Sequence, residues 1–145
     1  MTLIFLLEQN DKFYNILSRF EDKTKELKVF ASINDLSVAL EENEPDLLLF
    51  SEDFLADPEL INILSFTQSL VIDNILLSIT KHKQAYPLTE LIDCYLTFMD
   101  SPDYIRMTID RHINKRGRVK SLQQSIFESN ALTEKSLTLA IRFAP

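Results

Sequence analysis

The side chains of this chain that could take part in chemistry are acids and hydroxyls that directly follow short apolar segments. They are Glu8 after residues 3–7, Ser51 with Glu52 and Asp53 after residues 47–50, and Ser78 after residues 75–77. A serine attacks as a nucleophile only when a neighbouring base takes its proton, and carboxylates bind hard cations such as Mg²⁺. The chemistry open to these residues is therefore nucleophilic attack or cation binding.

The chain has two histidines that could serve as the base, and neither is well placed to do so. His82 lies between two lysines in a predicted loop, and His112 lies in the predicted last helix. We therefore interpret Ser51 as a small polar residue that ends a strand. We expect no catalytic residue, and we predict that the chain is not an enzyme.

Acidic residues could gather at one edge of a parallel sheet and hold a cation weakly. The candidates are Glu8, Glu52, Asp53 and Asp57. The alternative, which we favour, is an acidic rim that faces solvent. No group of Cys, His and carboxylate side chains in the sequence has the spacing of a zinc site. We therefore predict neither a metal ion nor another cofactor.

Glycine content and net charge argue against several classes of ligand. Gly117 is the only glycine, so the glycine-rich loops that wrap phosphates cannot be built. A formal net charge of −7 argues against nucleic acid as a partner. The one basic segment, residues 111–120, has no interleaved aromatic residues, and we interpret it as a solvated helix face.

The sequence also bears on the compartment. One cysteine, Cys94, cannot form an internal disulfide, which favours a reducing environment. No apolar segment reaches the length of a membrane span, and the first residues lack the basic segment of a secretion signal. We expect a cytoplasmic protein that does not bind membranes.

Five short apolar runs alternate with amphipathic segments along the chain. The runs cover residues 3–7, 27–31, 47–50, 71–79 and 94–98. Strand-length segments that are mostly apolar are typical of parallel sheets covered by helices on both faces. We predict an α/β fold with a doubly wound five-stranded parallel sheet, in which ligands would bind at the carboxyl ends of the strands.

Helices are predicted between these runs. Ser32 and Ser101 have the residue type and position of helix N-caps. After Ser101, Ile105, Ile109 and Ile113 recur every four residues and are expected to cover the sheet. A short helix is expected at residues 88–92.

The chain beyond residue 116 is additional to the five strand–helix units. Gly117 is predicted to end or kink the last helix. After it, a second apolar helical stripe comprises Val119, Leu122, Ile126 and Phe127. Residues 136–143 fit both a strand and a helix; we favour a helix to about residue 128 and leave the end open. We divide the chain into a domain at 1–116 and a C-terminal extension at 117–145, which would be a linker or a dimerisation element.

Four phrases, in this order, resemble the strands of a response-regulator receiver domain, the CheY-like fold. They are IFLLEQN at 4–10, PDLLLFS at 45–51, ILLS at 75–78 and YLTFMDSP at 95–102. The resemblance covers about residues 2–116. It implies a phosphorylation pocket at the carboxyl edge of the sheet.

The resemblance also shows what this pocket would lack. Ser51 stands where the family has its phospho-accepting Asp, and Glu8 and Gln9 stand where it has its Mg²⁺-binding acidic pair. Phe98 stands in place of the lysine that neutralises the phosphoryl group, whereas Ser78 matches the family's hydroxyl. We interpret the chain as a degenerate receiver, or pseudo-receiver, that cannot be phosphorylated in the family's way.

Two alternatives to this interpretation remain. The first is an atypical working receiver that is phosphorylated at Asp53 with Mg²⁺, and the weaker one is an unrelated small α/β enzyme. Phe98 and the following Met99 could either fill the vacated pocket, which we favour, or present an apolar patch to a partner.

Receivers commonly dimerise through their fourth helix, fifth strand and fifth helix, and the resemblance implies a matching surface here. We predict an interaction surface that comprises Leu88, Tyr95, Tyr104, Met107 and Arg111, with Leu122 and Ile126 on the extension. The expected partner is a second copy of the chain, as a homodimer, or another signalling protein. The whole would be the regulatory domain of a larger signalling protein that acts by protein–protein interaction.

Overall fold

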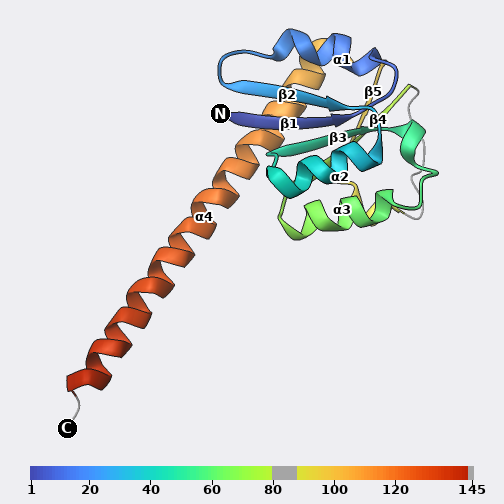
Figure 1. Ribbon diagram of the computed structural model, residues 1–145. Coiled ribbons are helices and arrows are strands. Elements are labelled where there is room, and N and C mark those ends of the chain that lie inside the picture. The colour runs from blue at the N-terminus through green and yellow to red at the C-terminus, as the bar shows by residue number, and fades with distance from the viewer. Residues whose placement is uncertain (80–87, 144–145) are drawn as a thin grey trace.

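The computed structural model describes residues 1–79 and 88–143, with side chains as far as residue 128. Within these residues, one sheet of parallel strands has the order β2-β1-β3-β4-β5 (Figure 1). The strands are β1 (Thr2–Leu7), β2 (Lys25–Phe30), β3 (Leu47–Ser51), β4 (Asp73–Ser78) and β5 (Cys94–Thr97). The predicted doubly wound α/β fold is confirmed.

Helices cover both faces of this sheet. The α-helices are α1 (Lys12–Leu17), α2 (Ile33–Glu42), α3 (Leu60–Ser69) and α4 (Pro102–Phe143), and the 3₁₀ turns are η1 (Ser18–Phe20), η2 (Glu52–Phe54) and η3 (Leu88–Leu91). Both predicted N-caps are confirmed. The Ser32 hydroxyl accepts a hydrogen bond from the Asp35 N–H at 3.1 Å, and the Ser101 hydroxyl accepts one from the Tyr104 N–H at 3.2 Å.

The alternation of side chains along the strands builds two cores, one on each face of the sheet. Phe5, Leu48 and Leu76 join residues of α2, α3 and η3 on one face. Ile4 and Leu49 join residues of α1 and α4, including Ile105 and Ile109, on the other face. Both faces are thus buried, which is why the strands are apolar throughout.

The last helix, α4, runs far beyond the sheet, and its C-terminal half projects away from the domain (Figure 1). The prediction that Gly117 ends the helix is wrong, because the helix continues to Phe143. A glycine inside a helix costs only about 1 kcal/mol, which the contacts of its neighbours can offset. The continuous helix also places residues 136–143 in a helix, so the strand alternative for that segment is wrong.

The turn between α3 and β4 contains a strained residue. Val71 has a positive φ of 59° and lies at the position where a helix C-terminus usually carries glycine. Its N–H donates to the Gln68 carbonyl at 3.0 Å, and the next N–H, of Ile72, donates to the Thr67 carbonyl at 2.9 Å. These two bonds form a Schellman motif. A left-handed backbone at a β-branched residue costs about 1–3 kcal/mol, so other contacts must hold this turn.

None of the described helices combines the length with the apolar character that a membrane span needs.

Candidate functional site

The site that the sequence predicts lies at the carboxyl edge of the sheet, where β1, β3, β4 and β5 end. Glu8, directly after β1, is only 2% exposed. Its two carboxylate oxygens accept hydrogen bonds from the Phe13 N–H at 2.8 Å and the Tyr14 N–H at 3.0 Å. These are donors of the first turn of α1, so Glu8 caps this helix through both oxygens. Gln9 beside it is exposed.

Ser51, at the end of β3, is also buried, at 5% exposed. Its hydroxyl donates to the Asp53 carboxylate at 3.1 Å and accepts from the Asp53 N–H at 3.3 Å. The same Asp53 oxygen accepts a hydrogen bond from the Asn10 side chain at 3.5 Å. Asp53 itself is exposed and lies in the turn η2 rather than on the strand.

The other two pocket positions close the edge from the β4 and β5 side. Ser78 is 4% exposed, and its carbonyl accepts from the Phe98 N–H at 2.9 Å. The Phe98 ring packs edge-to-face on the ring of Phe13, with the ring centroids 5.9 Å apart. Phe98 remains 45% exposed and Met99 76% exposed, so Met99 does not fill the pocket and Phe98 only partly covers it. Phe98 thus contributes an aromatic contact with α1 at this edge.

The acids near this edge do not converge on one point. Among the described residues, no group of three or more His, Cys, Asp or Glu side chains is arranged to hold a metal ion. The Glu52 carboxylate accepts from the Ile79 N–H at 3.3 Å, whereas the Glu8 carboxylate is turned toward α1. His82 belongs to residues 80–87, outside the described part of the chain.

The predicted interaction surface is exposed except at one position. Leu88 is only 4% exposed and lies in the core beneath η3, so its assignment to that surface is wrong. The turn η3 is short, and Leu88 packs in the same core as Leu91 and Ile92. The other members lie at the surface, where Tyr95 is 41%, Tyr104 48%, Met107 70%, Leu122 64% and Ile126 60% exposed, and Arg111 is exposed as well.

A second polar constellation, which sequence reasoning missed, lies at the opposite, amino-terminal edge of the sheet. Four residues of the basic segment pair with that edge: His112, Lys115, Arg116 and Lys120. The interpretation of this segment as a solvated helix face is therefore wrong for Arg116, which is 3% exposed, and for His112, whose side chain is 11% exposed, whereas the side chains of Lys115 and Lys120 remain 51% and 48% exposed. The sequence did contain a sign of these ion pairs, because Asp46 and Asp73 are acids that stand at the starts of two mostly apolar strand segments.

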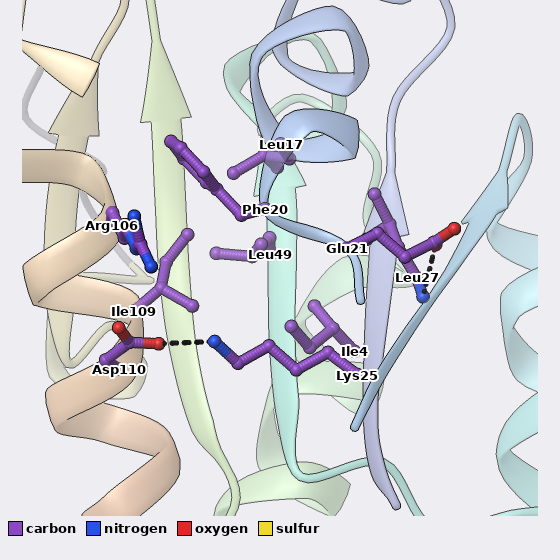
Figure 2. Close-up of a pocket in the computed structure, with 10 residues that line it drawn as sticks. All are labelled: Ile4, Leu17, Phe20, Glu21, Lys25, Leu27, Leu49, Arg106, Ile109 and Asp110. Atoms are coloured by element: carbon purple, nitrogen blue, oxygen red, sulfur yellow. Dashed lines mark hydrogen bonds and ion pairs between the residues drawn. The ribbon is translucent and has the colours of Figure 1, made fainter. Parts of the chain in front are cut away.

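A small apolar pocket lies between η1 and α4 (Figure 2). Its floor includes Ile4 and Leu49, and the ion pair between Lys25 and Asp110, 2.9 Å long, lies at its edge (Figure 2). The cavity measures about 20 Å³, which is room for one water molecule. Its size is that of a packing gap beside the short helix α1.

Comparisons with known proteins agree with this fold. No protein-family model and no curated protein matches the chain. The receiver domain of the Francisella response regulator 1452 superposes with a TM-score of 0.60 at 18% identity, over 79% of this chain and 98% of that one. The receiver domain of the TMAO respiratory system response regulator TorR gives 0.66 at 15% identity, over 79% and 98%. A fusion that contains the trimeric coiled coil of yeast Spc42 gives 0.64 at 11% identity, over 97% and 96%.

Proposed function

Starting from the receiver fold of this chain, we propose that it is a signalling module that does not accept a phosphoryl group and acts by binding proteins. The observation that carries the proposal is the Glu8 carboxylate, both of whose oxygens accept backbone N–H groups of α1. Mg²⁺ needs several hard oxygen ligands in octahedral geometry. Two of the roughly four lone-pair positions of this carboxylate are already taken by α1, which leaves fewer for a cation.

The neighbouring positions support the same conclusion. An acyl phosphate forms only on a carboxylate, and Ser51 has a hydroxyl that already hydrogen-bonds to Asp53. A phosphoryl group at this edge would meet the Phe98 ring instead of an ammonium group. Without a bound Mg²⁺ or a lysine ammonium group to offset it, the phosphoryl charge of nearly −2 would be poorly stabilised.

We expect the amide NMR spectrum of the protein in Mg²⁺ to stay unchanged when beryllofluoride, a phosphoryl mimic, is added. Chemical-shift changes at residues 8, 51–53 and 78 would contradict the proposal. The Asp53→Asn variant then identifies the acceptor: if the changes disappear in this variant, the chain is an atypical receiver that uses Asp53.

The partner we propose is a second copy of the chain, bound through the extension. Leu122, Ile126 and Phe127 are 64%, 60% and 73% exposed on a continuous helix. Helices with an apolar stripe at three- and four-residue spacing commonly pair along it. The fusion with the yeast coiled coil superposes over 97% of this chain, a span that includes most of the extension. The fused segment is a trimeric coiled coil, so the superposed structure contains a helix that self-associates.

Sedimentation of the purified chain is expected to give a concentration-dependent dimer that the Ile126→Glu variant converts to a monomer. A buried charge at the centre of an apolar contact is unfavourable unless it is paired. The matched control is Ser121→Glu, which adds the same charge at an exposed position on the opposite face of the helix. A wild-type chain that stays monomeric at its highest soluble concentration would contradict self-association through the extension.

A further inference from the structure

The amino-terminal edge of the sheet holds two buried acids that are paired by α4. Asp73, the first residue of β4, is 7% exposed, as is Asp46, which directly precedes β3. The Asp73 carboxylate lies 2.5 Å from His112 Nδ1 and 3.1 Å from Lys115 Nζ. The Asp46 carboxylate pairs with Lys120 and also accepts the Leu3 N–H at 2.9 Å.

Arg116 occupies the middle of this cluster and is 3% exposed. Its guanidinium donates to the Leu70 carbonyl at 2.7 Å and pairs with Glu44. The Glu44 side chain is 50% exposed, so the counter-charge is largely in solvent. The Nε atom of Arg116 is buried without a hydrogen-bond partner. A nearly buried cation is thus only partly compensated, which is unfavourable.

The strained turn belongs to the same cluster. The carbonyl that Arg116 binds belongs to Leu70, directly before Val71 with its positive φ. The orphaned Nε would regain water as a hydrogen-bond partner if α4 moved away from this edge. The attached state therefore depends on all of its ion pairs together, and loss of one favours loss of the rest.

We propose that this ionic cluster is a releasable anchor, which attaches or detaches as one unit and thereby sets the direction in which the C-terminal half of α4 leaves the domain. Residues 112–120 span more than two helical turns across the edge of the sheet. While they are attached, the apolar stripe at Leu122 and Ile126 is held in one orientation relative to the sheet. Release would free this stripe to turn with the helix, by a route that needs no phosphoryl group.

If the ionic cluster attaches and detaches as one unit, a substitution at Asp73 should affect Arg116, although the two side chains are not bonded to each other. Asp73→Asn removes the charge that His112 and Lys115 pair with, yet Asp73 makes no hydrogen bond or ion pair with Arg116. If the cluster is one unit, this variant should speed exchange of the Arg116 Nε proton with water by about tenfold or more, as local opening becomes more frequent. The ¹⁵N-resolved Nε–H signal of Arg116 measures this rate directly.

The matched control is Lys25→Met, which breaks the ion pair between Lys25 of β2 and Asp110 of α4. This variant should leave the exchange rate of the Arg116 Nε proton unchanged. Amide signals of β1 and β3 report whether each variant remains folded. If Asp73→Asn does not fold, Lys115→Met is used in its place, because Lys115 is 51% exposed. Measurement in the Ile126→Glu background makes the result independent of self-association.

An Arg116 rate that is unchanged in the folded Asp73→Asn or Lys115→Met variant would overturn the proposal, because the pairs would then be independent. A rate that rises equally in Lys25→Met would also overturn it, because the loosening would be general to α4. Faster ¹⁵N reorientation of residues 121–128 in the released variant is the expected accompanying result.

Discussion

Glu8→Gln is expected to lower the free energy of unfolding by about 3 kcal/mol, because hydrogen bonds to a buried charged group contribute about 1.5–3 kcal/mol each. The carboxylate accepts two N–H groups at 2.8 and 3.0 Å and is 2% exposed. Glutamine keeps one acceptor oxygen and turns an NH₂ group toward the second N–H. Asp11 at the N-cap makes no side-chain cap bond, and Asn10 accepts only the Lys12 N–H, at 3.4 Å, so neither replaces the bonds of Glu8. Urea unfolding followed by circular dichroism measures the change.

The sign of this change separates a structural Glu8 from a metal-binding one. In a working acidic pocket without its cation, carboxylates repel one another, and neutralising one of them stabilises the fold. Here, loss of the cap should destabilise it. Glu26→Gln, at an exposed position on β2, is the matched control and should change stability by less than about 0.5 kcal/mol. A Glu8→Gln protein as stable as the wild type, or more so, would restore the cation-binding interpretation.

Stability is expected to fall as the pH rises from about 6.5 to about 9, because His112 is charged in the folded protein. Asp73, and secondly Cys94, raise the pKa of His112 from 6.5 to about 9, against the effect of burial. A pKa that is higher in the folded state contributes stability that is fully present below pH 6.5 and is lost as the pH rises through about 9. The shift corresponds to a loss of roughly 3 kcal/mol at most.

At low pH, the expected loss of stability comes from Asp73, whose pKa is shifted in the opposite direction to that of His112. Burial by itself would raise the pKa of Asp73, but the hydrogen bonds from His112 and Lys115 outweigh it and lower this pKa below 3.8. The contribution of Asp73 is therefore present above pH 3.8 and is lost as the pH falls through its depressed pKa. Between pH 3.8 and pH 6.5, the ionisation of Asp73 and His112 should therefore leave the free energy of unfolding nearly independent of pH.

Urea unfolding of the wild type and of His112→Gln across this range measures the alkaline loss. The variant should be less stable than the wild type at pH 6.5 and should show little further loss up to pH 9. Cys94→Ser is the second control, because Cys94 also contributes to the raised pKa of His112. An equal alkaline loss in His112→Gln and the wild type would assign the effect to another group.

Much of the fold follows from short-range patterns in the sequence. The apolar runs at 3–7 and 47–50 are strands because a segment buried on both faces must be apolar on both. The N-caps Ser32 and Ser101 bond to N–H groups three residues away, so residue type and position were enough to predict them. The residue types at the carboxyl edge also follow from the sequence, including Ser51 where the family resemblance expects an aspartate.

The roles of individual polar side chains were decided only by the tertiary structure. Glu8 stands next to Gln9 in an acidic-looking loop, yet it caps α1, because the path of the chain after β1 brings that helix over it. Leu88 was expected at a surface, and the packing of η3 buries it. The helix through Gly117 is likewise continuous, although glycine alone predicts a break.

The basic segment shows the physical reason most clearly. His112 pairs with an acid 39 residues away, and Lys120 with one 74 residues away. Periodicity reports which face of a helix is apolar, but it carries no information about which distant backbone edge that helix will cross. A charged residue on such a helix therefore has the same local pattern whether it faces water or a buried carboxylate. Only the crossing of α4 over the starts of β3 and β4 distinguishes the two.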